Sequence, residues 1–285
     1  MHKATALRAS LNRGELLLAM GAHNGMSAKL AERHRFDAIW ASSFEISAAY
    51  GVPDASILTM TEFLAAAQSM NESVAIPVIA DCDSGFGDAS IVERMVAKYE
   101  AAGIAAVCIE DKKFPKLNSF VGTAQQLESV TEFVTKISAG VAARQNPDMV
   151  FIARTEALIA GRPMEEALAR AHAYADAGAD MILIHSKKRS ADEVMEFGRR
   201  WGGRVPLVVV PTTYYEPVAE DFHKVGVQIV IYANQAMRSA VRAMNETMAR
   251  IRMARTTKPV EHEIASMEEI FELQGMALLK RAVGS

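Results

Sequence analysis

The sequence holds two aspartates, Asp81 and Asp83, at a spacing that could bind a metal ion. They end the apolar run PVIADCD, and Cys82 separates them. Because side chains alternate between the two faces of an extended strand, both carboxylates point to one side and Cys82 to the other. Oxygen ligands without histidine or cysteine partners suit a hard cation, above all Mg2+ that keeps several waters. On spacing alone, a helix cap and a salt bridge also explain the pair.

Three further side chains close other apolar runs. Each is the last residue but one of its run: Glu110 in AAVCIED, Arg154 in MVFIART and His185 in DMILIHS. A third carboxylate beside the aspartates would raise the pKa of each acid unless a cation lay between them. Arg154 and His185 point to an anionic partner, such as a phosphate or carboxylate of a substrate. The alternative for Arg154 is a structural ion pair with Glu156 or with the acidic residues.

A charged stretch, IEDKKFPKLNSF, spans residues 109–120 and opens a long connection. Helical periodicity resumes only after residue 126, so residues 111–126 exceed the roughly 4–6 residues of a usual connection. Long loops of this kind serve as lids, with Pro115 to stiffen this one and Gly122 as a hinge. Its lysines could draw in an anionic substrate, while a mobile basic surface loop is the alternative. These lysines are Lys112, Lys113 and Lys116.

The elements that must position these residues show in the hydrophobic pattern. Short runs rich in valine and isoleucine recur, and most are continuously apolar, as in strands covered by helices on both faces. The predicted strands are 16–22, 37–43, 77–83, 105–111, 149–155, 180–186, 206–212 and 228–234. Between them lie segments with apolar residues three and four apart, which predict helices. Eight such units without a Rossmann glycine fingerprint predict a (β/α)8 TIM-type barrel, an α/β fold.

In a barrel of this type, the active site lies at the carboxyl ends of the strands. Seven predicted strand ends carry polar or charged side chains, and their convergence favours an active site over seven unrelated solvated ends. The residues are Ser42, Ser43, Asp81, Asp83, Glu110, Asp111, Arg154, His185, Thr212 and Asn234.

The predicted catalytic barrel domain covers residues 1–255, and residues 256–285 form a linker and an additional C-terminal helix. The segment 266–283 is amphipathic. A helix outside a completed barrel must bury its apolar stripe on its own barrel or on a neighbouring subunit, and the residues leave both open.

The composition narrows the class of partner. The net charge of -3 and the absence of a long basic block argue against nucleic acid and anionic membranes as partners. Cys82 and Cys108 form neither a disulfide framework nor a zinc pattern and suit a reducing compartment. No apolar run approaches the ~18 residues of a membrane span, and the N-terminus lacks a signal-peptide core. We expect a cytoplasmic protein that acts on a small molecule.

The loop motif EDKKFPKLNS resembles a motif of the isocitrate lyase and phosphoenolpyruvate mutase superfamily, E-D-K-x-F-P-K-x-N-S. The resemblance is greatest to the group that holds phosphoenolpyruvate mutase and phosphonopyruvate hydrolase, and within it to the mutase. It extends over about residues 15–250, in IWASSFEISAAYGVPDAS, DCDSGFGD, RTEALIAG, EEALARAHAYADAGAD, ILIHSK, VVVPTTYY and IYAN.

The resemblance implies a set of ligands for Mg2+ and for the substrate. Asp81 would bind Mg2+ directly, and Asp54, Asp83 and Glu110 would hold it through water. The backbone amides around Ser43 and Phe44, with Ser42 and Trp40, would hold a pyruvyl group. Many relatives have glycine at Ala41 or Ser43, a change that a role of backbone N–H groups tolerates.

The resemblance also implies how a phosphoryl group is held. Arg154, His185 and the lid residue Asn118 would surround it, with Lys116 and Ser119 helping to close the lid. The implied reaction interconverts phosphoenolpyruvate and phosphonopyruvate. Related hydrolases, which release phosphate, carry threonine where this chain has Asn118, so asparagine favours the mutase. Exchange of the C-terminal helix between subunits is also implied, in a homodimer or homotetramer.

Two other classes remain as alternatives. A carbon–carbon lyase on a 2-methylisocitrate- or oxaloacetate-like acid would carry a catalytic cysteine in a K-K/R-C-G-H loop, whereas this loop reads EDKKFPK and Cys108 lies upstream of it. A non-catalytic barrel would be expected to lack a metal or phosphate ligand, and each implied ligand is present in the sequence.

Overall fold

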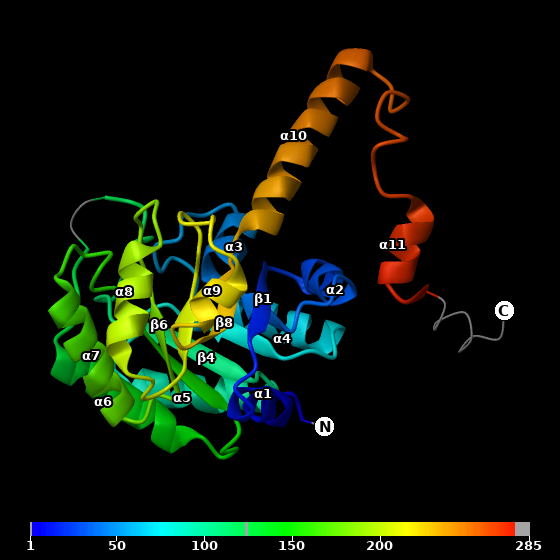
Figure 1. Ribbon diagram of the computed structural model, residues 1–285. Helices are drawn as coiled ribbons and strands as arrows, with labels where there is room; N and C mark the ends of the chain where they lie inside the picture. The colour runs from blue at the N-terminus through cyan, green and yellow to red at the C-terminus, as the bar shows by residue number, and fades with distance from the viewer. Residues whose placement is uncertain (1, 123–124, 277–285) are drawn as a thin grey trace. The chain divides into compact units, whose positions relative to one another are not determined.

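Eight parallel strands close into a barrel in the computed structural model, which describes residues 2–122 and 125–276 (Figure 1). The strands are hydrogen-bonded in chain order, and β8 pairs with β1. All eight predicted strands and the predicted (β/α)8 barrel are confirmed. The strands are β1 Leu17–Ala22, β2 Ala38–Ala41, β3 Val78–Asp81, β4 Ala106–Glu110, β5 Val150–Thr155, β6 Met181–Ile184, β7 Leu207–Val209 and β8 Val227–Tyr232.

Helices surround the barrel, and several begin with a side-chain cap just after a strand-end loop. Asn24, Thr59 and Ser129 each form a capping box, and Asp88 accepts from the amides of Ser90 and Ile91. Such caps satisfy amides that the first turn leaves without partners. The helices of this unit are α1 Lys3–Asn12, α2 Gly25–Arg33, α3 Ser43–Ala49, α4 Met60–Ser73, α5 Ala89–Ala101, α6 Val130–Ala143, α7 Met164–Asp176, α8 Asp192–Trp201 and α9 Ala219–His223.

The core has two layers, because strand side chains alternate between the barrel interior and the helices. In β4, Ala106 and Cys108 belong to the interior cluster, whereas Val107 and Ile109 pack with the surrounding helices. Both faces of the strands are therefore apolar, which explains why the strand runs read as continuous.

Helix α1 was not expected from the sequence, and it covers the amino-terminal end of the barrel (Figure 1). Ala4, Leu7 and Leu11 join the interior cluster, and Arg8 donates to Asp180 at 2.9 Å. This end of the barrel is thus filled by apolar side chains. The opposite rim is left for chemistry, as the fold predicts.

The described chain divides into two compact units, and the boundary along the chain lies between Asn234 and Gln235. The second contains α10, Gln235–Ala254, and α11, Met267–Leu273. From the sequence, we predicted that the catalytic domain ends after α10, at residue 255. It stays a prediction that α10 folds with the barrel. Helix α11 confirms the start of the predicted amphipathic helix, whereas residues 277–283 lie outside the described residues. None of the described helices is long and apolar enough to cross a membrane.

Candidate active site

The amino-terminal turn of α3 lies beside Asp81, at the end of β3. Ser42 caps this helix by accepting from the amide of Glu45. The Ser43 hydroxyl donates to Asp81 Oδ2 at 2.9 Å, and the Ser43 amide donates to the same oxygen at 3.3 Å. The carboxylate is therefore held by the end of a helix, where amides and the helix dipole favour negative charge.

Lys116 places its ammonium group among the carboxylates. Its Nζ lies 2.5 Å from Asp54 Oδ1 and 3.1 Å from Asp83 Oδ1, and the side chain is buried. Burial lowers the pKa of Lys116, but the charges of Asp83 and Asp54 outweigh this effect and raise the pKa above its ordinary value. The loop lysine is therefore a fixed cation inside the acidic group.

The carboxylates themselves are crowded. Burial raises the pKa of Asp83 to about 7, with Lys116 opposing the shift and the charges of Asp81, Asp54 and Glu110 adding to it. Burial likewise raises the pKa of Asp81. Four predicted acids from different parts of the chain thus lie close enough to affect one another's pKa, and Lys116 contacts two of them. They form the acidic group of the site: Asp54, Asp81, Asp83 and Glu110.

These acids fit a hard cation. Asp83 Oδ2 is buried and has no hydrogen-bond partner within the described residues. Asp83 Oδ1 and Glu110 Oε1 also accept no hydrogen bond there, but each faces a lysine ammonium group, at 3.1 Å and 3.6 Å. Buried acceptors of this kind are costly unless a cation or water meets them. Among residues 2–122 and 125–276, no three His, Cys, Asp or Glu side chains already form a chelating group. A site with one direct ligand and water-mediated contacts to the other acids needs no such group.

The turn after the aspartates brings the backbone close to helix α5. Asp83 itself has a φ of 48°, and Gly85 follows with a φ of 86°. A Cβ on Gly85 would lie 2.5 Å from Val92 Cγ2. The turn therefore requires glycine at position 85, both for its left-handed backbone and for space.

Arg154 and His185 lie together at the ends of β5 and β6. Arg154 Nη2 is 2.8 Å from His185 Nδ1, and Arg154 Nε lies 3.2 Å from Glu110 Oε2. Burial lowers the pKa of His185, and the charge of Arg154 lowers it further. Arg154 also pairs with Glu156, with Nε donating to Oε1 at 2.6 Å. The ion pair with Glu156 that was considered for Arg154 is thus present, and Arg154 also contacts Glu110 of the acidic group.

The loop after β4 folds over this rim with its polar side chains inward. Asn118 Nδ2 donates to Asp54 Oδ2 at 2.7 Å, and the amide of Lys116 donates to Ser56. Ser119 is buried and donates to Glu156 at 2.6 Å. The apolar side chains Phe114, Leu117, Phe120 and Val121 are exposed instead. Residues 123 and 124 of the predicted lid lie outside the described residues.

The loop is anchored at both ends by backbone contacts. The amide of Lys113 donates to the Gln126 carbonyl at 3.0 Å, and the amide of Glu128 donates to the Asp111 carbonyl at 2.9 Å. Asp111 is buried, accepts from Tyr174 at 2.6 Å and has a pKa raised by burial to about 6. The loop therefore stands on a fixed base next to Glu110.

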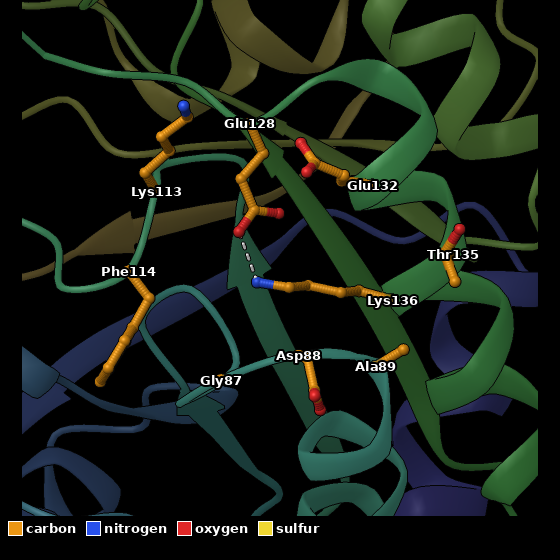
Figure 2. A pocket seen from close by; sticks show the side chains of 9 residues that line it. All are labelled: Gly87, Asp88, Ala89, Lys113, Phe114, Glu128, Glu132, Thr135 and Lys136. Atoms are coloured by element: carbon orange, nitrogen blue, oxygen red, sulfur yellow. Dashed lines mark hydrogen bonds and ion pairs between the residues drawn. The ribbon is translucent and has the colours of Figure 1, made fainter.

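A separate pocket of about 620 Å3 lies between the loop and the start of α6, and none of its lining residues is a predicted site residue (Figure 2). Lys113 and Phe114 of the loop line one side of it. At its floor, Lys136 pairs with Glu128 at 2.7 Å and donates to the Ser84 carbonyl at 3.0 Å. This lysine ties the turn that follows Asp83 to α6.

The structure brings most of the predicted residues together. Phe44 is more than one-third exposed, and Trp40 is buried in the barrel interior. The Thr212 amide donates to Val210, and no contact of Thr212 with the acidic group is seen in the described part of the chain. The sequence missed the central position of Glu156. Its spacing from Arg154 was the available signal, because residues two apart on a strand share a face.

Comparisons with known proteins place this geometry in a family. The chain matches the family described as phosphoenolpyruvate phosphomutase over residues 7–252. It is 49% identical to a phosphonopyruvate hydrolase of Variovorax sp. (strain Pal2), over 96% of each chain. The structure is similar to a phosphoenolpyruvate phosphomutase of Streptomyces platensis subsp. rosaceus, with a TM-score of 0.97, 48% identity and coverage of 99% of this chain and 98% of the other.

A second solved structure is similar too, that of a phosphonopyruvate hydrolase in complex with oxalate and Mg2+. Its TM-score is 0.94, its identity 48%, and the match covers 99% of this chain and 98% of the other. These two solved structures, one of a mutase and one of a hydrolase, are equally identical to the chain in sequence. The chain belongs to the phosphoenolpyruvate phosphomutase family and is an enzyme of the superfamily that joins phosphoenolpyruvate mutase and isocitrate lyase.

Proposed function

We propose that the protein is a phosphoenolpyruvate mutase, which interconverts phosphonopyruvate and phosphoenolpyruvate with Mg2+ as cofactor. The observation that carries the proposal is the position of Asn118, whose amide group reaches Asp54 from the loop at 2.7 Å. A loop held in this way closes the site against water, and a phosphoryl group then has only the enolate as an acceptor.

The proposed metal ligands are the acidic group, with Asp81 binding directly and Asp54, Asp83 and Glu110 through water. When bound, Mg2+ supplies positive charge that stabilises the enolate of the pyruvyl group. The amides of Ser43 and Phe44, together with Ser42 and Trp40, hold the pyruvyl end. The Ser43 amide already binds a carboxylate oxygen, that of Asp81, at 3.3 Å.

The proposed phosphoryl site consists of Arg154, His185 and Asn118, with Lys116 and Ser119 holding the loop closed. In the forward step the C3–P bond of phosphonopyruvate breaks, and its electron pair remains on the pyruvyl group as an enolate. The enolate oxygen then attacks the same phosphorus atom and forms the O–P bond. No proton or water enters the balance. Phosphoryl transfer of this kind depends mainly on positioning and on charge stabilisation.

Phosphonopyruvate hydrolase is the second candidate, and the relative from Variovorax sp. favours it. In that reaction water captures the phosphoryl group and yields pyruvate and phosphate. Asn118 favours the mutase because its side chain joins the loop to Asp54 by a hydrogen bond, and related hydrolases carry threonine at this position. A carbon–carbon lyase has less support, since no cysteine occurs in residues 111–126.

The experiment is 31P NMR of the enzyme with phosphonopyruvate and Mg2+. A growing phosphoenolpyruvate signal is expected. Inorganic phosphate would instead identify a hydrolase, and an unchanged spectrum would contradict both. A sample with excess EDTA serves as control and should show no turnover.

We further propose that the enzyme is cytoplasmic and acts as a homodimer or homotetramer. Helix α10 supports the second point, because it exposes Val241, Met244 and Met248, which are three and four residues apart and so share one face. Apolar side chains in such a row are typical of an interface. The C-terminal helix is proposed to pack on the partner subunit.

A further inference from the structure

Glu156 is a fully buried carboxylate that contacts two groups of residues with different tasks. Its Oε1 accepts from Arg154 Nε at 2.6 Å and lies 2.8 Å from His185 Nδ1. Its Oε2 accepts from the Ser119 hydroxyl at 2.6 Å and lies 3.2 Å from Lys112 Nζ. One oxygen therefore meets the barrel residues, and the other meets the loop.

The loop side of this contact is a complete hydrogen-bond network. The Ser119 hydroxyl accepts from Lys112 Nζ at 2.7 Å and from Arg154 Nη2 at 3.2 Å, and it donates its own proton to Glu156. Both acceptor sites and the single donor of the hydroxyl are used. Only an acceptor at position 156 fits this arrangement.

Charge reinforces the same geometry. Burial alone would raise the pKa of Glu156, but Arg154, His185 and Lys112 outweigh it and hold the pKa well below its ordinary value. The contacts are hydrogen bonds to a buried charged group, which are stronger than those between neutral groups. Removing one partner of such a network costs more than a surface ion pair would.

We propose that Glu156 is a positioning residue that couples closure of the loop to the orientation of Arg154 and His185. This inference rests on the proposed function, in which these two residues bind the phosphoryl group. The loop cannot leave the rim without breaking the contacts of Ser119 and Lys112 with Glu156. A phosphoryl group that orders Arg154 and His185 therefore also favours the closed loop. Water is then excluded while the phosphoryl group is transferred.

The test compares three variants with the parent enzyme. Glu156→Gln keeps the size of the side chain and removes the charge and one acceptor. Ser119→Ala removes the hydroxyl and with it the contacts to Glu156, Lys112 and Arg154, while the carboxylate of Glu156 stays in place. Asp180→Asn is the matched control, since Asp180 accepts from Arg8 at 2.9 Å and from Arg144 at 2.5 Å at the opposite end of the barrel.

Two readouts are measured, amide hydrogen exchange in residues 112–121 and the ratio of inorganic phosphate to phosphoenolpyruvate formed from phosphonopyruvate. We expect Glu156→Gln to speed exchange in the loop by roughly tenfold or more, and Ser119→Ala to speed it less. Both variants should raise the share of phosphate. Asp180→Asn should leave loop exchange and the product ratio as in the parent. The product ratio does not depend on the folded fraction, so a loss of stability alone cannot produce the change.

Loop exchange in Glu156→Gln equal to that of the parent would overturn the inference, as would an equal effect of Asp180→Asn. If Glu156→Gln does not fold, Ser119→Ala decides alone, and parental exchange in that variant counts against the coupling. A parent enzyme that does not turn over phosphonopyruvate would contradict the proposed function, while the exchange comparison would still decide the role of Glu156.

Discussion

Asn118 distinguishes the two reactions at the scale of single residues. Its Nδ2 donates to Asp54 and its Oδ1 accepts from the amide of Phe120, so the side chain joins the loop to the acidic group. The amide makes the two contacts through two separate atoms, whereas threonine would have to make both through the one oxygen of a shorter side chain.

Replacing Asn118 should therefore damage transfer more than folding. We expect Asn118→Ala to lower kcat for phosphoenolpyruvate formation by roughly 10^2- to 10^3-fold, the usual cost of one preorganised donor. Asn118→Thr should shift the products toward phosphate. Initial rates and product ratios from 31P NMR, with thermal unfolding as a check on the fold, measure both. Near-parental kcat in the alanine variant would show that the loop side chain has no part in transfer.

The acidic group predicts how Mg2+ affects stability. Because burial and mutual repulsion disfavour the charged acids, a cation that binds only the folded protein should stabilise it. At about 100 times its Kd, Mg2+ should add about 2.7 kcal/mol, or roughly 5–10 °C in Tm. Calorimetry with Mg2+ and with EDTA gives the shift. Asp81→Asn should abolish it, and a variant that keeps the full shift would remove Asp81 from the metal site.

At the scale of elements, the turn between β3 and α5 positions Asp83. Its Gly85 has a φ of 86°, and an added Cβ would meet Val92 at 2.5 Å. The turn must therefore move if any side chain is placed there.

We expect Gly85→Ala to weaken Mg2+ binding by roughly 10- to 100-fold, because it displaces residues that orient the metal ligands. Gly161→Ala is the control, since Gly161 also has a positive φ, of 72°, yet nothing lies within 4 Å of its Cβ position. Titration calorimetry with Mg2+ separates the two. Equal affinities in both variants would mean that backbone strain alone explains the effect and that the turn does not position the acids.

The elements also show what could be read from the sequence. The strands were recognisable because both of their faces are apolar, and the strand ends followed from the barrel. Helix α1 was missed because only Ala4, Leu7 and Leu11 are buried in it, at the barrel end rather than along a helix layer. That α1 covers the amino-terminal end of the barrel depends on tertiary packing, which no local sequence pattern predicts.

The position of Glu156 could not be predicted for a similar reason. The sequence offered it as an ion-pair partner of Arg154, which the structure confirms at 2.6 Å. Its contacts with Ser119 and Lys112 depend on how the loop folds back, and loop conformation leaves little trace in hydrophobic periodicity. The lysines of the loop were read as a charge that attracts substrate, yet Lys112 and Lys116 are buried among acids.

At the scale of the whole molecule, the exposed apolar row on α10 and the amphipathic C-terminal segment predict assembly of subunits. Deleting residues 256–285 should lower the number of subunits in each particle, because the proposed partner contact is lost. Light scattering of the full and shortened chains measures this. The control is Met248→Leu, which keeps the surface apolar and should keep the mass. An unchanged number of subunits after the deletion would mean that the segment packs within its own subunit.

The central claim concerns the whole enzyme, namely that the phosphoryl group moves within one molecule and that water does not take part. It is tested most directly by following a single turnover of phosphonopyruvate with Mg2+ in 18O-labelled water by 31P NMR. We predict a phosphoenolpyruvate resonance without an isotope shift and with no accompanying phosphate. Inorganic phosphate carrying one 18O atom as the first product would contradict the account and identify water as the acceptor.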